Sequence, residues 1–327
     1  GPSKKAAILE GSKAFMKDLC RTYDIPTARY QRFTDVVAAT TYLEDFNGDD
    51  VVIKADGLAA GKGVVIPKSR EEAKSAVKMM LEKQKFGAAS EEIVIEEFLQ
   101  GVEASFFALT DGESILPFGT AEDHKRAHDN DEGPNTGGMG AFSPSPLVDH
   151  KMQQKVISNI LEPTLNGLKA EGITYKGVLY AGLMIVEGEP KLLEYNVRFG
   201  DPECQVLMMR LGAQALDLMQ AAAEGRLAEA QVNWADDHAL TVVMAANGYP
   251  GSYEKGSAIK GLDDCAEDSF HMVFHAGTSE KDGQIVATGG RVLNVTARGA
   301  SLAQARDRAY AMVDRIDWPE GFCRRDI

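Results

Sequence analysis

The fold of this chain is decided by the stretch Val51-Val-Ile-Lys-Ala-Asp-Gly-Leu-Ala-Ala-Gly-Lys-Gly-Val-Val-Ile66, in which a glycine-rich turn separates two short β-branched runs. Backbone N–H groups of such a turn, together with the ammonium groups of Lys54 and Lys62, suit the binding of phosphates. A Walker A loop is excluded, because the glycine spacing is one residue short, Gly63 replaces the metal-binding Ser or Thr, and a strand follows. The stretch therefore predicts a β-hairpin flap over phosphates, and a plain hairpin turn is the alternative.

The composition narrows the class of protein. The chain has 327 residues, of which 44% are hydrophobic and 26% charged, enough for a sizeable core and two or three domains. Asp and Glu outnumber Lys and Arg by 49 to 35, and the resulting net charge of −14 repels nucleic acid and anionic membranes. No apolar run approaches the roughly 20 residues of a membrane span, and the first residues lack the apolar segment of a signal peptide.

The four cysteines lie far apart and form no Cys-x-x-Cys pair. This pattern favours neither a disulfide framework nor a thiolate zinc site. We therefore expect a cytoplasmic enzyme of mixed α and β structure from a reducing compartment. It is expected to be a monomer that binds neither nucleic acid nor membrane.

Hydrophobic periodicity and turn signals predict the elements of the fold. Helices are expected over residues 12–23, 34–46, 70–85, 149–170, 203–224 and 301–316. Strands are expected over residues 51–54, 63–66, 93–98, 104–110, 113–118, 178–186, 191–197, 240–246, 271–276 and 291–297. The polar stretch 120–146 is expected to be a long functional loop, and a domain boundary is expected near 234–238.

Two strand ends carry groups that suit a nucleotide and its metal. After the run Ile93-Val-Ile95, the residues Glu96, Glu97, Phe98 and Leu99 leave the sheet with Glu103 close behind, which suits an adenine edge and ribose hydroxyls. A solvated strand end is the alternative there. Further on, alternation places Glu194, Asn196 and Arg198 on one face of a strand. Carboxylate and amide oxygens suit magnesium, and the arginine suits a phosphate or acyl phosphate; a polar strand face is the alternative.

The stretch that follows and the long loop predict a substrate site. Asp201-Pro202 resembles a helix start, with Asp as cap and Pro at the first position, which is also an anion site. The loop holds Asp123-His-Lys-Arg126 and Asn135-Thr-Gly-Gly-Met-Gly140. Its cations suit an anion, and its glycines allow a close backbone approach. His124 and His128 have the spacing of a metal pair on a helix, but their Gly, Pro and acidic neighbours oppose a helix, so zinc is not expected.

In order and spacing these segments resemble the phosphoribosylamine–glycine ligase family of the ATP-grasp superfamily. Further stretches that carry the resemblance are Glu10-Gly-Ser-Lys13, Gly133-Pro-Asn-Thr-Gly-Gly-Met-Gly140, Asn247-Gly-Tyr-Pro-Gly251 and Gly289-Gly-Arg-Val292. The resemblance covers nearly the whole chain. It implies an α+β ATP-grasp fold, two α+β subdomains that sandwich ATP, with a small β-rich C-terminal domain. The implied division is 1–29 with 101–234 as the central subdomain, 30–100 as the lid subdomain and 235–327 as the C-terminal domain.

The resemblance also implies the site residues. ATP would be bound by the set Lys13, Lys54, Gly61, Lys62, Gly63, Glu96, Glu97, Leu99 and Glu103, with Glu97 and Leu99 at the adenine and Glu103 at the ribose. Magnesium (or manganese) would be held by Glu194 and Asn196. Glycine and 5-phosphoribosylamine would be held by Asp123, Lys125, Asn135, Thr136, Gly137, Gly138, Arg198, Asp201 and Glu203. Within that last group, Arg198, Lys125 and Asp123 would be catalytic.

The reaction implied is an ATP-dependent ligation through glycyl phosphate, which forms glycinamide ribonucleotide and releases ADP and phosphate. Two departures are evident, the first from the pattern of many members of the superfamily and the second from the family. The strand 178–185 carries no acidic metal ligand, and the family's N-terminal Rossmann-like domain, roughly 90 residues by the usual size of such units, is expected to be missing. The alternatives are another ATP-grasp carboxylate–amine ligase of purine metabolism and a nucleotide-binding fragment without turnover.

Overall fold

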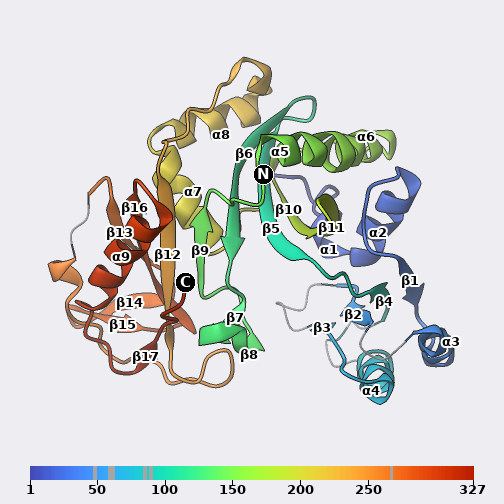
Figure 1. Cartoon of the computed structure of the whole chain (residues 1–327), viewed down its shortest axis with the longest axis horizontal. Coiled ribbons are helices and arrows are strands. Elements are labelled where there is room, and N and C mark those ends of the chain that lie inside the picture. Colours follow the sequence, from blue (N-terminus) through green and yellow to red (C-terminus); the bar gives the residue numbers. More distant parts are fainter. Residues whose placement is uncertain (47–49, 58–62, 84–86, 88–90, 266–267) are drawn as a thin grey trace. The chain divides into compact units, whose positions relative to one another are not determined.

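The computed structural model describes the chain except for residues 47–49, 58–62, 84–86, 88–90 and 266–267. The described residues form two compact units (Figure 1). The first contains residues 1–117, 147–198 and 221–228, and the second contains residues 118–146, 199–220 and 229–327. Each unit is therefore assembled from three separate stretches, so that residues far apart in sequence meet within it. No helix in the described part of the chain is long and apolar enough to cross a bilayer.

The first unit contains an antiparallel sheet in the order β11-β10-β5. Its strands are β5 (Val102–Thr110), β10 (Gly177–Val186) and β11 (Glu189–Asn196). The helices that accompany it are α1 (Ile8–Gly11), α2 (Lys13–Thr22), α5 (His150–Val156) and α6 (Glu162–Ala170), with a π turn at Ile157–Leu161 between the last two (Figure 1). Alternate residues of β10, namely Leu179, Ala181 and Leu183, face this core and are fully buried, as the period of a strand requires.

A second sheet of the first unit has the antiparallel order β1-β4-β2-β3. Its strands are β1 (Tyr30–Phe33), β2 (Val51–Ala55), β3 (Val64–Val65) and β4 (Ile93–Glu97), and α3 (Val36–Tyr42) and α4 (Arg70–Leu81) pack on it. A 3₁₀ turn at Leu43–Asp45 follows α3. Ile53 and Ile95 pair across the strands and face the helices. The alternation of a strand then turns Lys54 and Glu96 to the opposite face.

The second unit is built on β12 (His238–Ala246), which pairs with β9 (Gly140–Ser143), β16 (Arg291–Gly299) and β17 (Gly321–Phe322). β13 (His271–His275) extends the sheet beyond β16, and the last residues of β6 (Ile115–Asp123) pair with β9. Two hairpins are formed by β7 (Arg126–His128) with β8 (Glu132–Asn135) and by β14 (Thr278–Lys281) with β15 (Gln284–Ala287). Helix α9 (Leu302–Val313) packs on β12 and β16.

Most predicted helices and strands are confirmed, and three predictions are corrected. The stretch 120–146 is not one loop, because it contains β7, β8 and β9. The helix predicted over 203–224 is two helices, α7 (Glu203–Leu211) and α8 (Gln214–Glu224), because Gly212 has a φ of 63° that ends the first. Asp201 does not cap α7, whose capping residue is Pro202 after a cis peptide bond. The hairpin β14–β15 was not expected, since its strands are short and mostly exposed.

Candidate functional site

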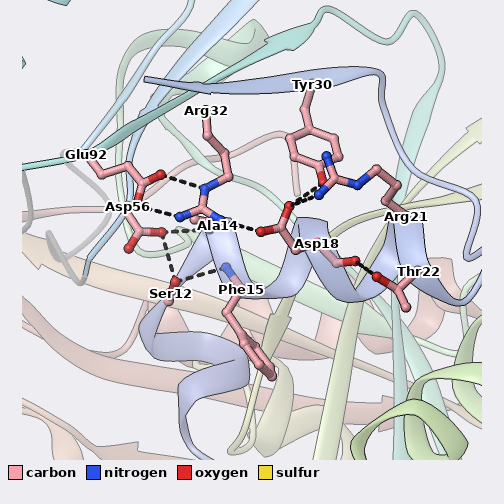
Figure 2. A network of polar contacts seen from close by, with 10 residues as sticks. All are labelled: Ser12, Ala14, Phe15, Asp18, Arg21, Thr22, Tyr30, Arg32, Asp56 and Glu92. Carbon is pink, nitrogen blue, oxygen red and sulfur yellow. Dashed lines mark hydrogen bonds and ion pairs between the residues drawn. The ribbon is translucent and has the colours of Figure 1, made fainter. Parts of the chain in front are cut away.

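The N-terminus of helix α2 is held by Asp56, the residue that follows strand β2. Ser12 caps the helix, because its Oγ accepts a hydrogen bond from the Phe15 backbone at 3.0 Å. The same Oγ donates to Asp56 Oδ1 at 3.0 Å, and the Ala14 backbone N–H donates to that oxygen at 2.6 Å. Asp56 thus acts as a second cap from another element (Figure 2). Lys13, the first residue of α2, is thereby placed beside Asp56 and Gly57.

A second contact joins the middle of α2 to the sheet of β1 and β4. Asp18 accepts a hydrogen bond from the Tyr30 hydroxyl at 2.7 Å and pairs with Arg32 on β1. Arg32 also forms a bidentate ion pair with Glu92, with Nε–Oε1 2.5 Å and Nη2–Oε2 2.9 Å (Figure 2). Bidentate geometry restricts both partners. The helix and the sheet are therefore fastened at two points along α2.

Between these contacts lies a buried charge cluster, which we define as Lys17, Lys54 and Glu96. The Lys17 Nζ is 2.9 Å from Glu96 Oε2, while the Lys54 Nζ is 3.0 Å from Oε1 and 3.1 Å from Oε2. Glu96 is 2% exposed. Burial alone would raise the pKa of Glu96, but the ammonium groups of Lys54 and Lys17 outweigh it and hold that pKa below its usual value. Glu96 is therefore an ionised, enclosed carboxylate.

Lys13 adds a third cation near this cluster. Its Nζ approaches the Gly57 carbonyl oxygen at 3.4 Å. Burial lowers the pKa of Lys13, Glu194 opposes that effect, and the positive charge of Lys54 lowers the pKa further. Two lysines that repel each other in a confined place gain from a shared anion. Lys13 and Lys54 are thus placed to bind a phosphate group.

An apolar cluster lies at the end of β4. Leu99 packs with Ala28 and Met184, and Val186 and Leu193 border the group. Glu97 binds the backbone of Arg29 twice. Its N–H donates to the Arg29 carbonyl at 2.9 Å, and its side-chain Oε1 accepts from the Arg29 N–H at 2.9 Å. Glu103 lies on β5 opposite Met184. The predicted adenine and ribose residues are therefore gathered around one apolar cluster.

The predicted metal ligands, Glu194 and Asn196, lie near the end of β11. Asn196 Oδ1 accepts a hydrogen bond from Arg198 Nη2 at 3.0 Å, and that Nη2 also lies 3.2 Å from Glu10 Oε1. Glu10 Oε2 accepts from the Val197 N–H at 2.9 Å. On the neighbouring strand β10, the residue paired with Glu194 is Gly182. That position of β10 therefore supplies no carboxylate beside Glu194. Among the described residues no group of three or more His, Cys, Asp and Glu is arranged to hold a metal.

The donor set nevertheless fits a hard divalent cation. Glu194 and Asn196 supply oxygen ligands only, and magnesium is usually held by one or two such groups together with water and substrate phosphates. The two side chains alternate along β11 with buried Tyr195, so both project to the same side. These two residues would suit a metal ion that takes its remaining ligands from water and from a bound phosphate.

In the second unit, Arg291 organises the glycine-rich loop. Its Nη1 donates to the carbonyl oxygens of Gly137 at 2.7 Å, Gly138 at 3.2 Å and Asp201 at 2.6 Å, and its Nη2 lies 3.0 Å from Asp201 Oδ2. The Gly137 N–H donates to the Tyr249 hydroxyl at 3.1 Å. A Cβ at Gly137 would lie 2.8 Å from Arg291 Nη2. The absence of a side chain at Gly137 therefore makes room for the guanidinium group of Arg291.

The other predicted substrate residues lie around this loop. The Lys125 carbonyl accepts two hydrogen bonds from Thr136, from its N–H at 2.7 Å and from its hydroxyl at 2.9 Å. Gly138 has a φ of 112°, and a Cβ there would lie 2.5 Å from Pro202 Cδ, so only glycine fits. Asp123 ends β6, Asn135 ends β8, and Glu203 begins α7 and is 3% exposed. All the predicted residues of this group except Arg198 belong to the second unit.

Two of the predicted site residues lie outside the described residues, and three residues of the candidate site were not predicted. Gly61 and Lys62 are outside the described residues, whereas the Gly63 carbonyl accepts a hydrogen bond from the Ala55 N–H at 2.8 Å. Lys17, Arg291 and Tyr249 were not predicted. The spacing of four residues between Lys13 and Lys17 puts both on one helix face and was the available signal for Lys17. Arg291 and Tyr249 lie within stretches used for the family resemblance.

Two α+β layers tied together through α2, with Lys13 of α2 close to both Lys54 of β2 and Glu194 of β11, are the arrangement of an ATP-grasp protein. The comparisons agree with this class and narrow it. Residues 11–204 match the family model "Phosphoribosylglycinamide synthetase, ATP-grasp (A) domain", and residues 239–327 match the C domain of the same synthetase. The chain belongs to the phosphoribosylglycinamide synthetase family.

Individual relatives support the same family. A phosphoribosylamine–glycine ligase of Mesorhizobium japonicum is 57% identical over all of this chain and 76% of its own length. A chloroplastic phosphoribosylamine–glycine ligase of Arabidopsis thaliana is 55% identical over all of this chain and 62% of its own. The crystal structure of the Thermotoga maritima phosphoribosylamine–glycine ligase matches with a TM-score of 0.93 and 37% identity, covering all of this chain and 81% of that one.

A more distant structure shares the fold alone. The biotin carboxylase domain of the Hydrogenobacter thermophilus 2-oxoglutarate carboxylase, solved with MgADP, matches with a TM-score of 0.76 at 18% identity, covering 99% of this chain and 69% of that one. The ATP-grasp fold of this chain is therefore shared with nucleotide-dependent enzymes of quite different sequence.

Proposed function

We propose that this chain catalyses the ATP-dependent joining of glycine to 5-phosphoribosylamine, with release of ADP and phosphate. The observation that carries the proposal is that Lys13 lies close to both Lys54 and Glu194 within one unit, which also holds the apolar cluster of Leu99. That arrangement suits a purine nucleotide whose phosphates are clamped by cations and a metal. The naming of relatives that are 50–57% identical to this chain supports glycine and phosphoribosylamine as the other substrates.

In the first step a glycine carboxylate oxygen attacks the γ-phosphorus of ATP. The bond from that phosphorus to the bridging oxygen breaks, ADP leaves, and glycyl phosphate forms. Catalysis at this step rests on position and on neutralisation of charge, so no protein nucleophile is required. We assign Lys13 and Lys54, with the turn 57–63 that contains Gly61, Lys62 and Gly63, to the phosphates. Glu97 and Leu99 are assigned to the adenine and Glu103 to the ribose.

In the second step the amine nitrogen of phosphoribosylamine attacks the carbonyl carbon of glycyl phosphate. The carbon–oxygen bond to phosphate breaks, inorganic phosphate leaves, and the nitrogen loses one proton as the amide forms. We assign Arg198 to the acyl phosphate, because it lies beside Asn196 and is not enclosed. The residues proposed to hold glycine and the amine are Asp123, Lys125, Asn135, Thr136, Gly137, Gly138, Asp201 and Glu203.

A divalent metal is proposed to be held by Glu194 and Asn196, with magnesium or manganese as the ion. When bound, such an ion withdraws charge from the phosphate oxygens. We also propose a division into a central subdomain of residues 1–29 and 101–234, a lid subdomain of residues 30–100 and a C-terminal domain of residues 235–327. The two sheets of the first unit, each with its own helices and core, support the separation of the first two.

The test is ADP release in the presence of ATP, Mg²⁺, glycine and freshly generated phosphoribosylamine, with each component omitted in turn. The proposal predicts release only when both glycine and the amine are present, together with a new amide product. Release with another amine acceptor and not with phosphoribosylamine would favour a different ATP-grasp ligase. Binding of Mg-ATP without release in any combination would identify a nucleotide-binding protein without turnover.

A further inference from the structure

Lys17 has an environment unlike that of Lys54, although both contact Glu96. Its side chain is completely buried, whereas the side chain of Lys54 retains 10% exposure. Both ammonium groups contact the same carboxylate, that of Glu96. Two cations therefore share one enclosed anion, and only one of them keeps access to solvent. This difference in exposure indicates different roles for Lys17 and Lys54.

Lys17 is fixed in place from a second side. Its Nζ donates to the Thr27 hydroxyl at 2.7 Å, and that hydroxyl donates its own hydrogen to the Leu192 carbonyl at 2.6 Å. Because the single hydrogen of Thr27 is used on Leu192, the oxygen can only accept from its other neighbour, which must then be a donor. The backbone at this point is held as well, since the Leu192 N–H donates to the Pro26 carbonyl at 2.8 Å.

We propose that Lys17 is the permanent counter-ion of Glu96, a positioning residue that frees the ammonium group of Lys54 to engage the phosphates of ATP. This inference rests on the proposed binding of ATP phosphates by Lys54. A buried carboxylate that loses a counter-ion is strongly destabilised. If Lys54 were the sole partner, moving its charge toward a phosphate would strip Glu96 of compensation. Since Lys17 stays in contact with Glu96, Lys54 can share its charge with a ligand.

The orientation of Glu96 agrees with this assignment. Lys17 contacts Oε2, the oxygen that also accepts a hydrogen bond from Lys54. Among the described residues, Oε1 has the ion-pair contact with Lys54 but no well-aligned hydrogen bond. Lys54 is therefore spread across both oxygens, while Lys17 holds one. Since only Lys54 of the two keeps some exposure, its contact with Glu96 is the one for which a phosphate can compete.

The test is a double-mutant cycle on Mg-ATP binding, which needs no turnover and so stays informative if the ligase assignment fails. Lys17→Met should weaken ATP binding at least about tenfold, since Lys54 is then retained by Glu96. In the Glu96→Gln background, where no charge needs a counter-ion, Lys17→Met should leave ATP binding nearly unchanged. Lys169→Met, which removes an exposed lysine paired with Glu113, is the matched control and should bind ATP normally.

A purely structural role predicts a different pattern. It would lower the melting temperature of Lys17→Met but leave the ATP affinity of the folded protein unchanged, or weaken it equally in both backgrounds. Either result overturns the proposal. If Lys17→Met does not fold, Thr27→Val provides the milder variant, because it removes the hydroxyl that holds Lys17 against Glu96. Thr27→Val should also weaken ATP binding, and unchanged affinity in that folded variant would contradict the proposal.

Discussion

Arg291 and Asp201, which are 90 residues apart in the sequence, form an ion pair with an Nη2–Oδ2 distance of 3.0 Å, and the same guanidinium binds the Asp201 carbonyl at 2.6 Å. Through its bonds to Gly137 and Gly138, Arg291 also holds the glycine-rich loop. A residue at the start of β16 thereby holds a loop whose glycines were expected to allow the close approach of a substrate.

Arg291→Ala should therefore impair the use of substrate more than the binding of nucleotide. Hydrogen bonds from a charged group contribute about 1.5–3 kcal/mol each, so we expect the KM for glycine or phosphoribosylamine to rise by about tenfold or more. The dissociation constant of Mg-ATP should stay the same. Steady-state kinetics and nucleotide titration measure the two effects. Arg306→Ala, at an exposed arginine paired with Asp307, is the control, and an equal effect there would contradict the role of Arg291.

Asp56→Ala should destabilise the protein and also weaken ATP binding. It removes the acceptor of the Ala14 N–H and Ser12 hydroxyl, and loss of a helix cap costs about 1 kcal/mol. The matched control is Asp35→Ala, which removes the cap of α3 by taking away the acceptor of the Ala38 N–H. Urea unfolding should show similar losses in both variants. Only Asp56→Ala should reduce ATP affinity, because only Asp56 positions Lys13; equal ATP affinities would refute this.

Glu194→Ala should abolish metal-dependent turnover while leaving the fold intact, because the side chain is exposed. Titration of Mg²⁺ in the ADP-release assay should give a higher half-saturating concentration or no activity. Glu189→Ala removes another exposed carboxylate from β11, one that pairs with Lys155. It should behave as wild type in that titration. A metal dependence of Glu194→Ala that matches wild type would remove Glu194 from the metal site.

The stability of the fold should depend on Glu96 in acid. Its pKa is lowered in the folded state, so its ionised form stabilises the protein above the unfolded value near 4.5. This stabilisation should be lost as the pH falls through the lower folded pKa. Urea unfolding of wild type and Glu96→Gln from pH 7 to pH 3 tests this: the difference between them should shrink toward low pH. A difference that is constant with pH would mean that the charge of Glu96 contributes nothing.

Cys20 should be chemically inert in the folded protein. Burial raises the pKa of its thiol to about 12, and only the thiolate reacts with alkylating reagents. At pH 8, iodoacetamide should leave Cys20 unmodified in the native protein and modify it in urea, as peptide mass spectrometry would reveal. Rapid native labelling of Cys20 would show that the core around α2 opens readily.

Several residues of the candidate site can be proposed from local sequence pattern alone. Lys54 stands out because a lysine ends an apolar strand, and Glu194 with Asn196 because alternation puts two oxygen ligands on one face. These signals need only the period of one strand. The buried state of Glu96 was less predictable, because glutamates at a strand end are usually solvated. Its burial depends on Lys17 and Lys54 arriving from two other segments.

Two of the corrected predictions failed because they depend on features that a local sequence pattern does not show. β9 is short, and its pairing with β12 joins segments about a hundred residues apart in sequence, so no local periodicity announces it. The break between α7 and α8 depends on the backbone conformation of Gly212, which an apolar helical pattern conceals.

By itself the sequence indicated most of the helices and strands, the family resemblance and candidate side chains for phosphate and metal binding, because these follow from periodicity, motif order and residue type. The tertiary structure decided which charges compensate one another. Lys17 with Glu96 and Arg291 with Asp201 are pairs of distant residues, and the energy of an ion pair depends on distance and burial, neither of which exists before the chain has folded.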